Sequence, residues 1–152
     1  MLTNHMKERA ADLRSDAGLA SALRVSLARL NRRLRRQAAP EAPTPTQLAV
    51  LAAVERHSGI SPSELAELEK MQPPSMTRVI AVLVERGLVE RTPHPTDRRQ
   101  VTVKVTEAGS TLLKEERRRK EAWLTQRLKD LTPQERAVLR EAAPILEKLS
   151  RL

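Results

Sequence analysis

The chain has 152 residues, a length typical of a single domain. Its 28 lysines and arginines exceed its 19 acidic residues, and the resulting formal charge of +9 indicates a polyanionic partner such as DNA, RNA or an acidic membrane. Cysteine is absent, which excludes disulfides, thiolate metal sites and thiol redox switches. No apolar run approaches the roughly 18 residues of a membrane span, and no secretory signal is visible. We therefore expect a cytoplasmic protein with no membrane partner.

The near absence of aromatic residues distinguishes between the remaining partners. Single-stranded nucleic acids and RNA loops are usually read by stacking bases on aromatic rings. Phenylalanine and tyrosine are absent, and Trp123 is the single tryptophan. A DNA duplex is held by charge and helix ends instead, so the composition favours double-stranded DNA, although arginine can also stack on bases.

Residues 1–15 are expected to form a flexible N-terminus, and residues 16–37 a helix with Leu23, Leu27, Leu30 and Leu34 along one stripe. A proline-rich link at residues 39–45 ends this helix. Two arginine pairs, Arg32-Arg33 and Arg35-Arg36, either contact phosphate or form a solvated face, the usual role of charge runs on long helices.

Three later helices begin with the same signal: a hydroxyl N-cap, a proline at the first helical position, and Gln or Glu at the third. The segments are Thr44-Pro45-Thr46-Gln47, Ser61-Pro62-Ser63-Glu64 and Thr132-Pro133-Gln134-Glu135. Gly59 is expected to cap the end of the helix that Thr44 starts. Because helix N-termini can hold phosphate, Thr44, Thr46 and Ser61 are candidate contacts to a DNA backbone.

The next helix is predicted over residues 73–86, with Gly87 closing it. Met76, Val79, Ile80 and Leu83 have the spacing of a buried stripe, which turns Ser75, Thr77 and Arg78 outward. A β-hairpin follows, with strands at residues 88–91 and 101–105. Strict alternation predicts that all three valines of the second strand share one buried face.

The tip of that hairpin is polar and carries Asp97-Arg98-Arg99. Its arginines are suited to a narrow minor groove, where negative potential is concentrated, and Asp97 is interpreted as a structural brace for Arg99. Residues 61–105 thus follow the order helix, turn, helix, hairpin of a winged helix-turn-helix. The leading residues of the second helix, Pro73, Ser75, Met76, Thr77 and Arg78, are the candidates for the major groove.

Thr106 is predicted to cap a helix reaching about residue 130, and Thr132 a last helix with Val138, Leu139, Ala142, Leu146 and Leu149 spaced for packing. Pro144 should bend or split this last helix. The basic run at residues 117–120 is interpreted as a solvated face, with phosphate contact or attraction of an acidic effector as alternatives.

The remaining residue types indicate no metal site. His5, His57 and His94 lack paired metal-ligand spacing, so surface or capping roles are favoured for them over a metal site. Trp123 is more readily a core or interface residue than part of a pocket, although both interpretations stay open. The sequence contains no Gly-rich phosphate loop, nucleophile elbow or clustered His and carboxylate site, so neither an enzyme nor a cofactor is expected.

Three segments, in this order and spacing, resemble the MarR family of bacterial transcription regulators. They are Pro73-Pro74-Ser75-Met76-Thr77-Arg78-Val79-Ile80, Leu83-Val84-Glu85-Arg86-Gly87-Leu88-Val89, and Asp97-Arg98-Arg99 followed by Val103-Lys104-Val105-Thr106-Glu107-Ala108-Gly109. The resemblance covers residues 16–152 as one domain. It implies a mainly α fold with a small β-hairpin wing (α+β), in which a winged lobe at residues 44–105 is joined to dimerisation helices at residues 16–38 and 106–152.

The same resemblance implies a homodimer that reads the half-sites of a palindromic operator, with the arginine at position 99 entering the minor groove. The dimer interface would be formed by leucines of the first and last helices, namely Leu23, Leu27, Leu139, Leu146 and Leu149. Many relatives bind a small aromatic or anionic effector beside the dimerisation helices, where Trp123 is the candidate lining residue. The expected function is sequence-specific repression of transcription under effector control. The alternative, based on charge alone, is a non-specific basic protein of the nucleoid or ribosome.

Overall fold

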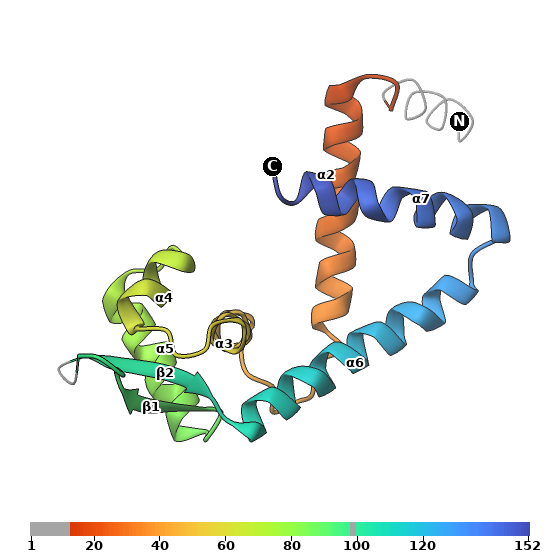
Figure 1. Cartoon of the computed structure of the whole chain (residues 1–152). Coiled ribbons are helices and arrows are strands. Elements are labelled where there is room, and N and C mark those ends of the chain that lie inside the picture. The colour runs from red at the N-terminus through yellow and green to blue at the C-terminus, as the bar shows by residue number, and fades with distance from the viewer. Residues whose placement is uncertain (1–12, 98–99) are drawn as a thin grey trace. The chain divides into compact units, whose positions relative to one another are not determined.

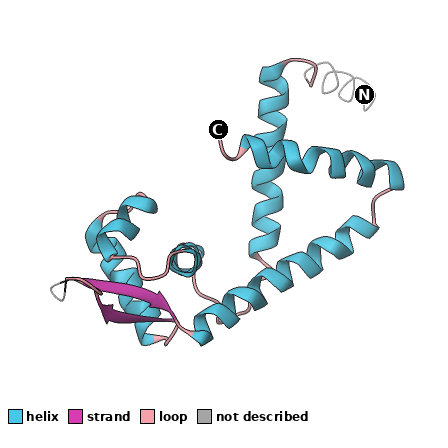
Figure 2. Cartoon of the chain, viewed as in Figure 1, coloured by secondary structure: helices cyan, strands magenta, loops and turns pink. Residues whose placement is uncertain are grey.

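The computed structural model of the chain describes residues 13–97 and 100–152. Its elements are α2 (Asp16–Arg35), α3 (Pro45–Arg56), α4 (Pro62–Leu68), α5 (Pro73–Glu85), β1 (Val89–Pro93), β2 (Val101–Val105), α6 (Glu107–Lys129) and α7 (Pro133–Leu149) (Figures 1 and 2). They divide between two compact units, residues 1–37 and 38–152. The fold is therefore helical with one antiparallel hairpin, as the sequence predicts.

Helix α2 is the regular element of the first unit. The Ser15 side chain caps it by accepting a hydrogen bond from the Gly18 amide at 3.1 Å. Asp16 lies in its first turn and three arginines in its last, which places charges of both signs favourably along the helix dipole. The helix ends at Arg35, two residues earlier than expected, and Leu27 and Leu30 of the leucine stripe are exposed.

The three predicted helix starts are confirmed. Thr44, Ser61 and Thr132 each accept a hydrogen bond from the amide three residues later, and the side chain at that position accepts a bond from the capping residue's own amide. Each box satisfies amides that a helix start would otherwise leave unpaired. The end of α3 differs from the expectation, because His57 is its C-cap and Gly59, with φ of +82°, lies in the turn beyond.

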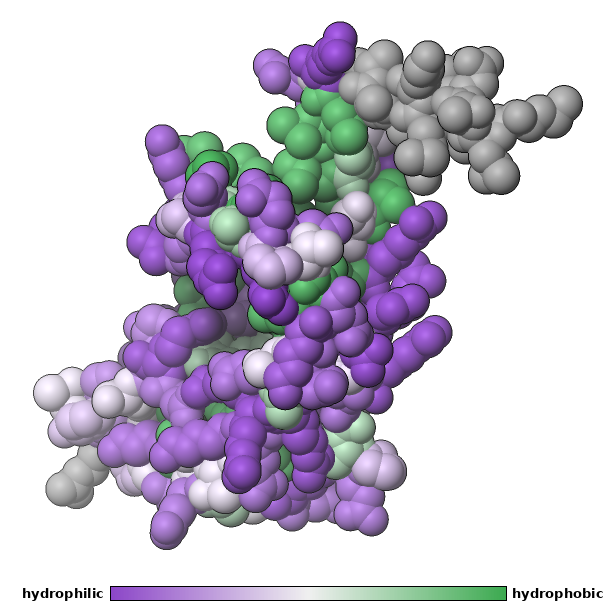
Figure 3. Space-filling view, turned by 90° about the vertical axis from the view of Figure 1, so that its right-hand side faces the viewer, coloured by the Kyte–Doolittle hydropathy of each residue, from purple (hydrophilic) through white to green (hydrophobic). Residues whose placement is uncertain are grey.

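A single hydrophobic core holds helices α3, α4 and α5 against the hairpin. Its fully buried large side chains are Leu51, Leu65, Met76, Ile80, Leu83, Val50, Val54 and Val103. Met76, Ile80 and Leu83 lie on the inward face of α5, as their spacing predicts. Hydrophilic side chains predominate on the lower part of the face shown in Figure 3.

The hairpin pairs β1 with β2 in antiparallel register, Val89 opposite Val105 and Arg91 opposite Val103. The prediction that all three valines of β2 are buried is wrong, since Val101 is 42% exposed. Thr102 is buried instead because its hydroxyl lies 2.9 Å from that of Thr92, which satisfies both polar groups. An additional bridge joins Ile60 to Val103, with the Val103 amide 2.8 Å from the Ile60 carbonyl.

The start of α6 is locked onto the hairpin by the Thr106-to-Gly109 segment. Thr106 caps the helix by accepting from the Gly109 amide, and its hydroxyl donates to the Gly87 carbonyl at 2.6 Å. A Cβ at position 109 would lie only 2.1 Å from the carbonyl oxygen of Leu88. Glycine is therefore required at this position by a close backbone approach.

Two acidic side chains tie α6 to the rest of the lobe. Glu55 of α3 accepts hydrogen bonds from Arg117 at 2.6 Å and from the Ser110 hydroxyl at 2.9 Å. These bonds hold the pKa of the Glu55 carboxyl below its usual value. Glu116 is buried and accepts from the Ala39 amide and from Arg119 through one oxygen. The basic run at residues 117–120 is thus partly used in structural ion pairs.

Helix α7 is continuous through Pro144, so this proline does not split it, and the bend expected there stays a prediction. All of α7 is described, and none of its residues is buried. Val138, Leu139, Ile145 and Leu149 are each between 45% and 66% exposed. Within residues 13–97 and 100–152, no helix combines the length and the apolar character needed to cross a bilayer.

Candidate nucleic-acid interface

A tight turn between α4 and α5 sets the entry of α5. Lys70 adopts a left-handed conformation with φ of +50°, and the Met71 amide donates to the Ala66 carbonyl at 2.8 Å. This 6→1 bond is the usual way in which a helix end reverses direction. Pro73 and Pro74 then start α5 immediately, because a proline ring is already in the helical conformation.

The first two turns of α5 present a polar ridge to solvent. Pro73, Ser75, Thr77 and Arg78 are exposed, as the spacing predicts. Met76 is the exception: its side chain is fully buried, so its assignment as a groove contact is wrong and it belongs to the core. The hydroxyl of Thr77 donates to the Pro73 carbonyl at 3.0 Å, which fixes its orientation and leaves its oxygen free to accept.

Side chains, not backbone amides, are the groups that α5 offers to a ligand. The two leading prolines have no amide proton, and the amides of Ser75 and Met76 both donate to the Gln72 carbonyl, at 3.0 and 3.1 Å. No acidic residue lies in the first turn. Arg78 and the hydroxyls of Ser75 and Thr77 are therefore the donors and acceptors that can read a base edge.

The candidate phosphate contacts at helix starts differ from one another. The Glu64 carboxylate accepts from the Ser61 hydroxyl at 2.7 Å and from the Ser61 amide at 2.9 Å. These bonds keep the pKa of Glu64 low, which places a negative charge where a phosphate would have to bind. At Thr44 the returning group is the neutral amide of Gln47, and Thr46 beside it is exposed. Thr44 and Thr46 suit an anion better than Ser61 does.

The hairpin tip is closed by two backbone hydrogen bonds. The His94 amide donates to the Gln100 carbonyl, and the Gln100 amide donates to the Asp97 carbonyl, both at 2.9 Å. Asp97 is half-buried in this turn. The predicted groove contacts Arg98 and Arg99 lie outside the described residues, so the bracing of Arg99 by Asp97 stays a prediction.

Two further residues shape this surface: His94, for which the sequence favours a surface or capping role, and Arg86, which sequence reasoning missed. His94 lies inside the hairpin tip, and its ring accepts hydrogen bonds from the turn that follows it. Arg86, at the end of α5, donates to the Glu41 carbonyl at 2.6 Å and so fastens the link before α3 to the groove helix.

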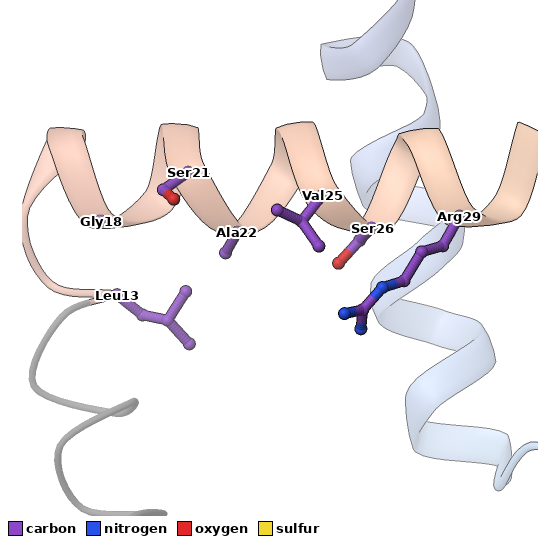
Figure 4. Close-up of a pocket in the computed structure, with 7 residues that line it drawn as sticks. All are labelled: Leu13, Gly18, Ser21, Ala22, Val25, Ser26 and Arg29. Carbon is purple, nitrogen blue, oxygen red and sulfur yellow. The ribbon is translucent and has the colours of Figure 1, made fainter.

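The residues predicted for dimerisation lie on helices with exposed apolar side chains. Leu27, Leu139 and Leu149 are exposed, and Leu23 and Leu146 are half-buried. The other side of α2 is lined with small residues. There a hollow of about 390 Å³ opens, toward which Leu13, Val25 and Arg29 point (Figure 4). Trp123, the candidate effector residue, is half-buried on α6.

Comparison with known proteins agrees with this geometry. Residues 44–101 match the model of the MarR family. An HTH-type transcriptional regulator of Mycobacterium tuberculosis is 44% identical over 134 residues, covering 88% of this chain and 94% of the relative. The HTH-type transcriptional repressor MdtR of Bacillus subtilis is 32% identical over 107 residues, covering 70% of this chain and 67% of the relative.

A solved structure supports the same assignment along most of the chain. It is a putative transcriptional regulator from Pseudomonas aeruginosa, which superposes with a TM-score of 0.81 at 33% identity and covers 90% of this chain and 96% of that one. The family consists of DNA-binding transcription regulators that are not enzymes. Sequence, fold and relatives agree, and the chain belongs to the MarR family of winged helix-turn-helix transcriptional regulators.

Proposed function

We propose that the chain acts as a homodimeric repressor that binds a palindromic operator, with one α5 in the major groove of each half-site. The observation that carries the proposal is the polar ridge of Ser75, Thr77 and Arg78 on a helix whose opposite face is anchored in the core. A reading helix must be rigid as well as exposed, because a specific base contact depends on fixed geometry.

Two further contacts complete the proposed interface. The hairpin tip, with Asp97 and the arginines at positions 98 and 99, would enter the adjacent minor groove. Thr44 and Thr46 would hold a backbone phosphate at the start of α3, a site with no acidic group in its first turn. Ser61 is the weaker candidate because Glu64 already occupies its donors.

Dimerisation is supported by the apolar side chains that α7 leaves exposed. Exposed leucines and valines in a row along a helix are costly in water, and a second copy of the chain would cover them. A twofold axis would place the two α5 helices about 34–36 Å apart, which matches successive major grooves. Leu23 and Leu27 of α2 are proposed to belong to the same interface.

Repression and effector control are the last parts of the proposal. A relative is named a transcriptional repressor, and a dimer on an operator can block polymerase by occupancy alone. A small aromatic or anionic effector would act near Trp123. Because Trp123 is the single tryptophan, its fluorescence is a direct probe: salicylate titrated into the protein should change the emission and weaken operator binding in parallel.

The central experiment is a fluorescence anisotropy titration with the DNA upstream of the protein's own gene and with a scrambled duplex at the same salt concentration. Preference for the upstream DNA supports a sequence-specific regulator. Equal affinities, with a steep dependence on salt, would instead support the non-specific basic protein.

Arg78→Ala tests the role of the ridge. If Arg78 reads a base edge, its loss should cost on the order of 1–3 kcal/mol and relax the preference at one base pair. Arg127→Ala is the matched control, since Arg127 is an exposed arginine at the end of α6 paired with Asp130. A uniform loss on all sequences would identify Arg78 as a phosphate contact, and no loss would remove it from the interface.

A further inference from the structure

The ring of His94 lies within the hairpin tip and is hydrogen-bonded to the residues that follow it. Its Nδ1 atom lies 3.3 Å from the amide nitrogen of Thr96 and 3.3 Å from that of Asp97, and 3.1 Å from the Thr96 hydroxyl. The His94 backbone amide, on the opposite side of the loop, donates to the Gln100 carbonyl. His94 is therefore hydrogen-bonded to Thr96 and Asp97 through its ring and to Gln100 through its backbone amide.

These contacts fix the protonation state of the ring. Backbone amides can only donate, so Nδ1 must be the nitrogen without a proton, and the neutral ring carries its hydrogen on Nε2. The Thr96 hydroxyl then also donates to Nδ1. Protonation of Nδ1 would remove the acceptor and point an N–H group at two other N–H donors, an arrangement that the turn cannot keep.

Other titratable groups surround this ring. Glu64 of α4 lies close enough to be affected by His94 and by His57, the C-cap of α3; both histidines contribute to the low pKa of Glu64, after the larger effect of its hydrogen bonds to Ser61. Asp97 lies within the same turn, half-buried. A positive charge on His94 would therefore have acidic neighbours, Glu64 and Asp97, that stabilise it once the turn has opened.

We propose that His94 is a positioning residue for DNA binding, because its neutral ring holds the turn that leads into positions 98 and 99 and its protonation releases that turn. This inference rests on the proposed function, in which the hairpin tip enters the minor groove. Operator affinity should then fall when the solution is made acidic enough to protonate the ring. This direction is opposite to that of a histidine that simply binds phosphate, which would gain affinity when charged.

Two substitutions distinguish the loss of the hydrogen-bond acceptor at position 94 from a change in the charge of this side chain. His94→Asn keeps an acceptor at the same distance from the backbone but cannot titrate, whereas His94→Ala removes the acceptor. At pH 7.5 we expect His94→Asn to bind the operator like the natural protein and His94→Ala to bind about tenfold more weakly, the effect of one lost hydrogen-bonded cap. When the pH is lowered from 7.5 to 5.5, the natural protein should lose operator affinity relative to His94→Asn.

His57→Asn is the matched control, because this histidine also faces Glu64 but accepts no bond from the tip. It should leave the pH dependence unchanged. Circular dichroism of each variant confirms that the lobe is folded. Equal binding by His94→Ala and the natural protein at pH 7.5 would overturn the proposal, as would a gain of affinity on acidification relative to His94→Asn.

A measurement without DNA keeps this test independent of the proposed function. In ¹H–¹⁵N spectra of the free protein, the amides of Thr96 and Asp97 should shift together between pH 8 and pH 5 and remain fixed in His94→Asn. If the amide signals of Thr96 and Asp97 in the natural protein do not shift with pH, the proposal that protonation of His94 releases the turn is disproved. If these amide signals shift with pH but the protein binds operator and scrambled DNA equally well, the role of His94 in the turn is retained. The proposed function as a sequence-specific regulator is then rejected.

Discussion

The winged lobe and helix α7 differ in the burial of their apolar side chains: the lobe buries them within one chain, and α7 leaves them exposed. The lobe brings α3, α4, α5 and the hairpin around one core, in which residues such as Leu51 and Leu83 are fully buried. Helix α7 has a comparable supply of leucine and valine, yet none of its residues is buried, and Leu139 and Leu149 are about half exposed. The apolar side chains of the lobe are thus covered within one chain, whereas those of α7 are left exposed.

Under the proposed function, this difference suits the two regions to separate tasks. A rigid lobe keeps the polar ridge of α5 in place, which base recognition requires. A helix with an unfilled apolar face is suited to association, because burying each leucine contributes about 1.5–3 kcal/mol. Changes that affect the lobe should reduce stability within one chain, and changes on α7 should affect only the pairing of chains.

The largest expected effect comes from Gly109→Ala at the joint of the lobe and α6. The new Cβ would lie 2.1 Å from the Leu88 carbonyl oxygen and 2.9 Å from Cγ2 of Val105, so backbone must move. We expect a loss of about 3 kcal/mol or more in the free energy of unfolding, measured with urea.

Gly87→Ala is the control for this substitution. Position 87 has φ of +67°, but an added Cβ there would meet no neighbouring atom within 4 Å, so it tests conformation without a clash. We expect a cost of about 1 kcal/mol, typical of a non-glycine residue in the left-handed region. Equal costs at the two positions would show that the contact at Gly109 relaxes without strain.

Leu139→Glu tests the role of α7. A buried carboxylate in an apolar contact is strongly disfavoured, so the dissociation constant of the proposed dimer should rise on the order of 100-fold. Analytical ultracentrifugation measures this constant, and urea unfolding at fixed concentration reports on the lobe. Arg140→Glu introduces the same side chain at the neighbouring, exposed polar position of α7 and should leave the dimer intact. An unchanged dimer, or loss of the lobe's fold, would contradict the separation of tasks.

The elements of the lobe could be predicted because their signals are local. Capping boxes at Thr44, Ser61 and Thr132 and the stripe on α5 are set by neighbours within one helical turn. The burial of Thr102 in place of Val101 depends on Thr92, which is ten residues away along the chain but opposite it in the hairpin. No local pattern contains that pairing.

The candidate site shows the same limit. Outward exposure of Ser75, Thr77 and Arg78 follows from helical spacing, and so does the burial of Met76, although its position within the reading segment suggests a contact. The acceptor role of His94 depends on how a turn folds back on its ring, and the close approach at Gly109 depends on two strands and a helix meeting. Both features depend on contacts formed only in the folded chain, so they cannot be predicted from a short stretch of sequence.

The smallest expected effect concerns the polar joint between α3 and α6. Hydrogen bonds from Arg117 and Ser110 lower the pKa of Glu55 in the folded protein, so the unfolded chain takes up this proton at a higher pH than the folded chain does. The contribution of Glu55 to stability is therefore fully present above the unfolded pKa and is lost as the pH falls through the folded one. Arg117 is largely exposed, with a side-chain exposure of 54%, so this contribution should stay below about 1 kcal/mol.

Glu55→Gln removes the titration and retains an acceptor for the Ser110 hydroxyl. In urea unfolding between pH 7 and pH 3.5, the natural protein should lose more stability than this variant, and the two should converge at the acidic end. Glu121→Gln, which removes an exposed acid from α6, should follow the natural protein across the range. Parallel curves for Glu55→Gln and the natural protein would mean that the ion pair between Glu55 and Arg117 adds nothing measurable to the stability of the contact between α3 and α6.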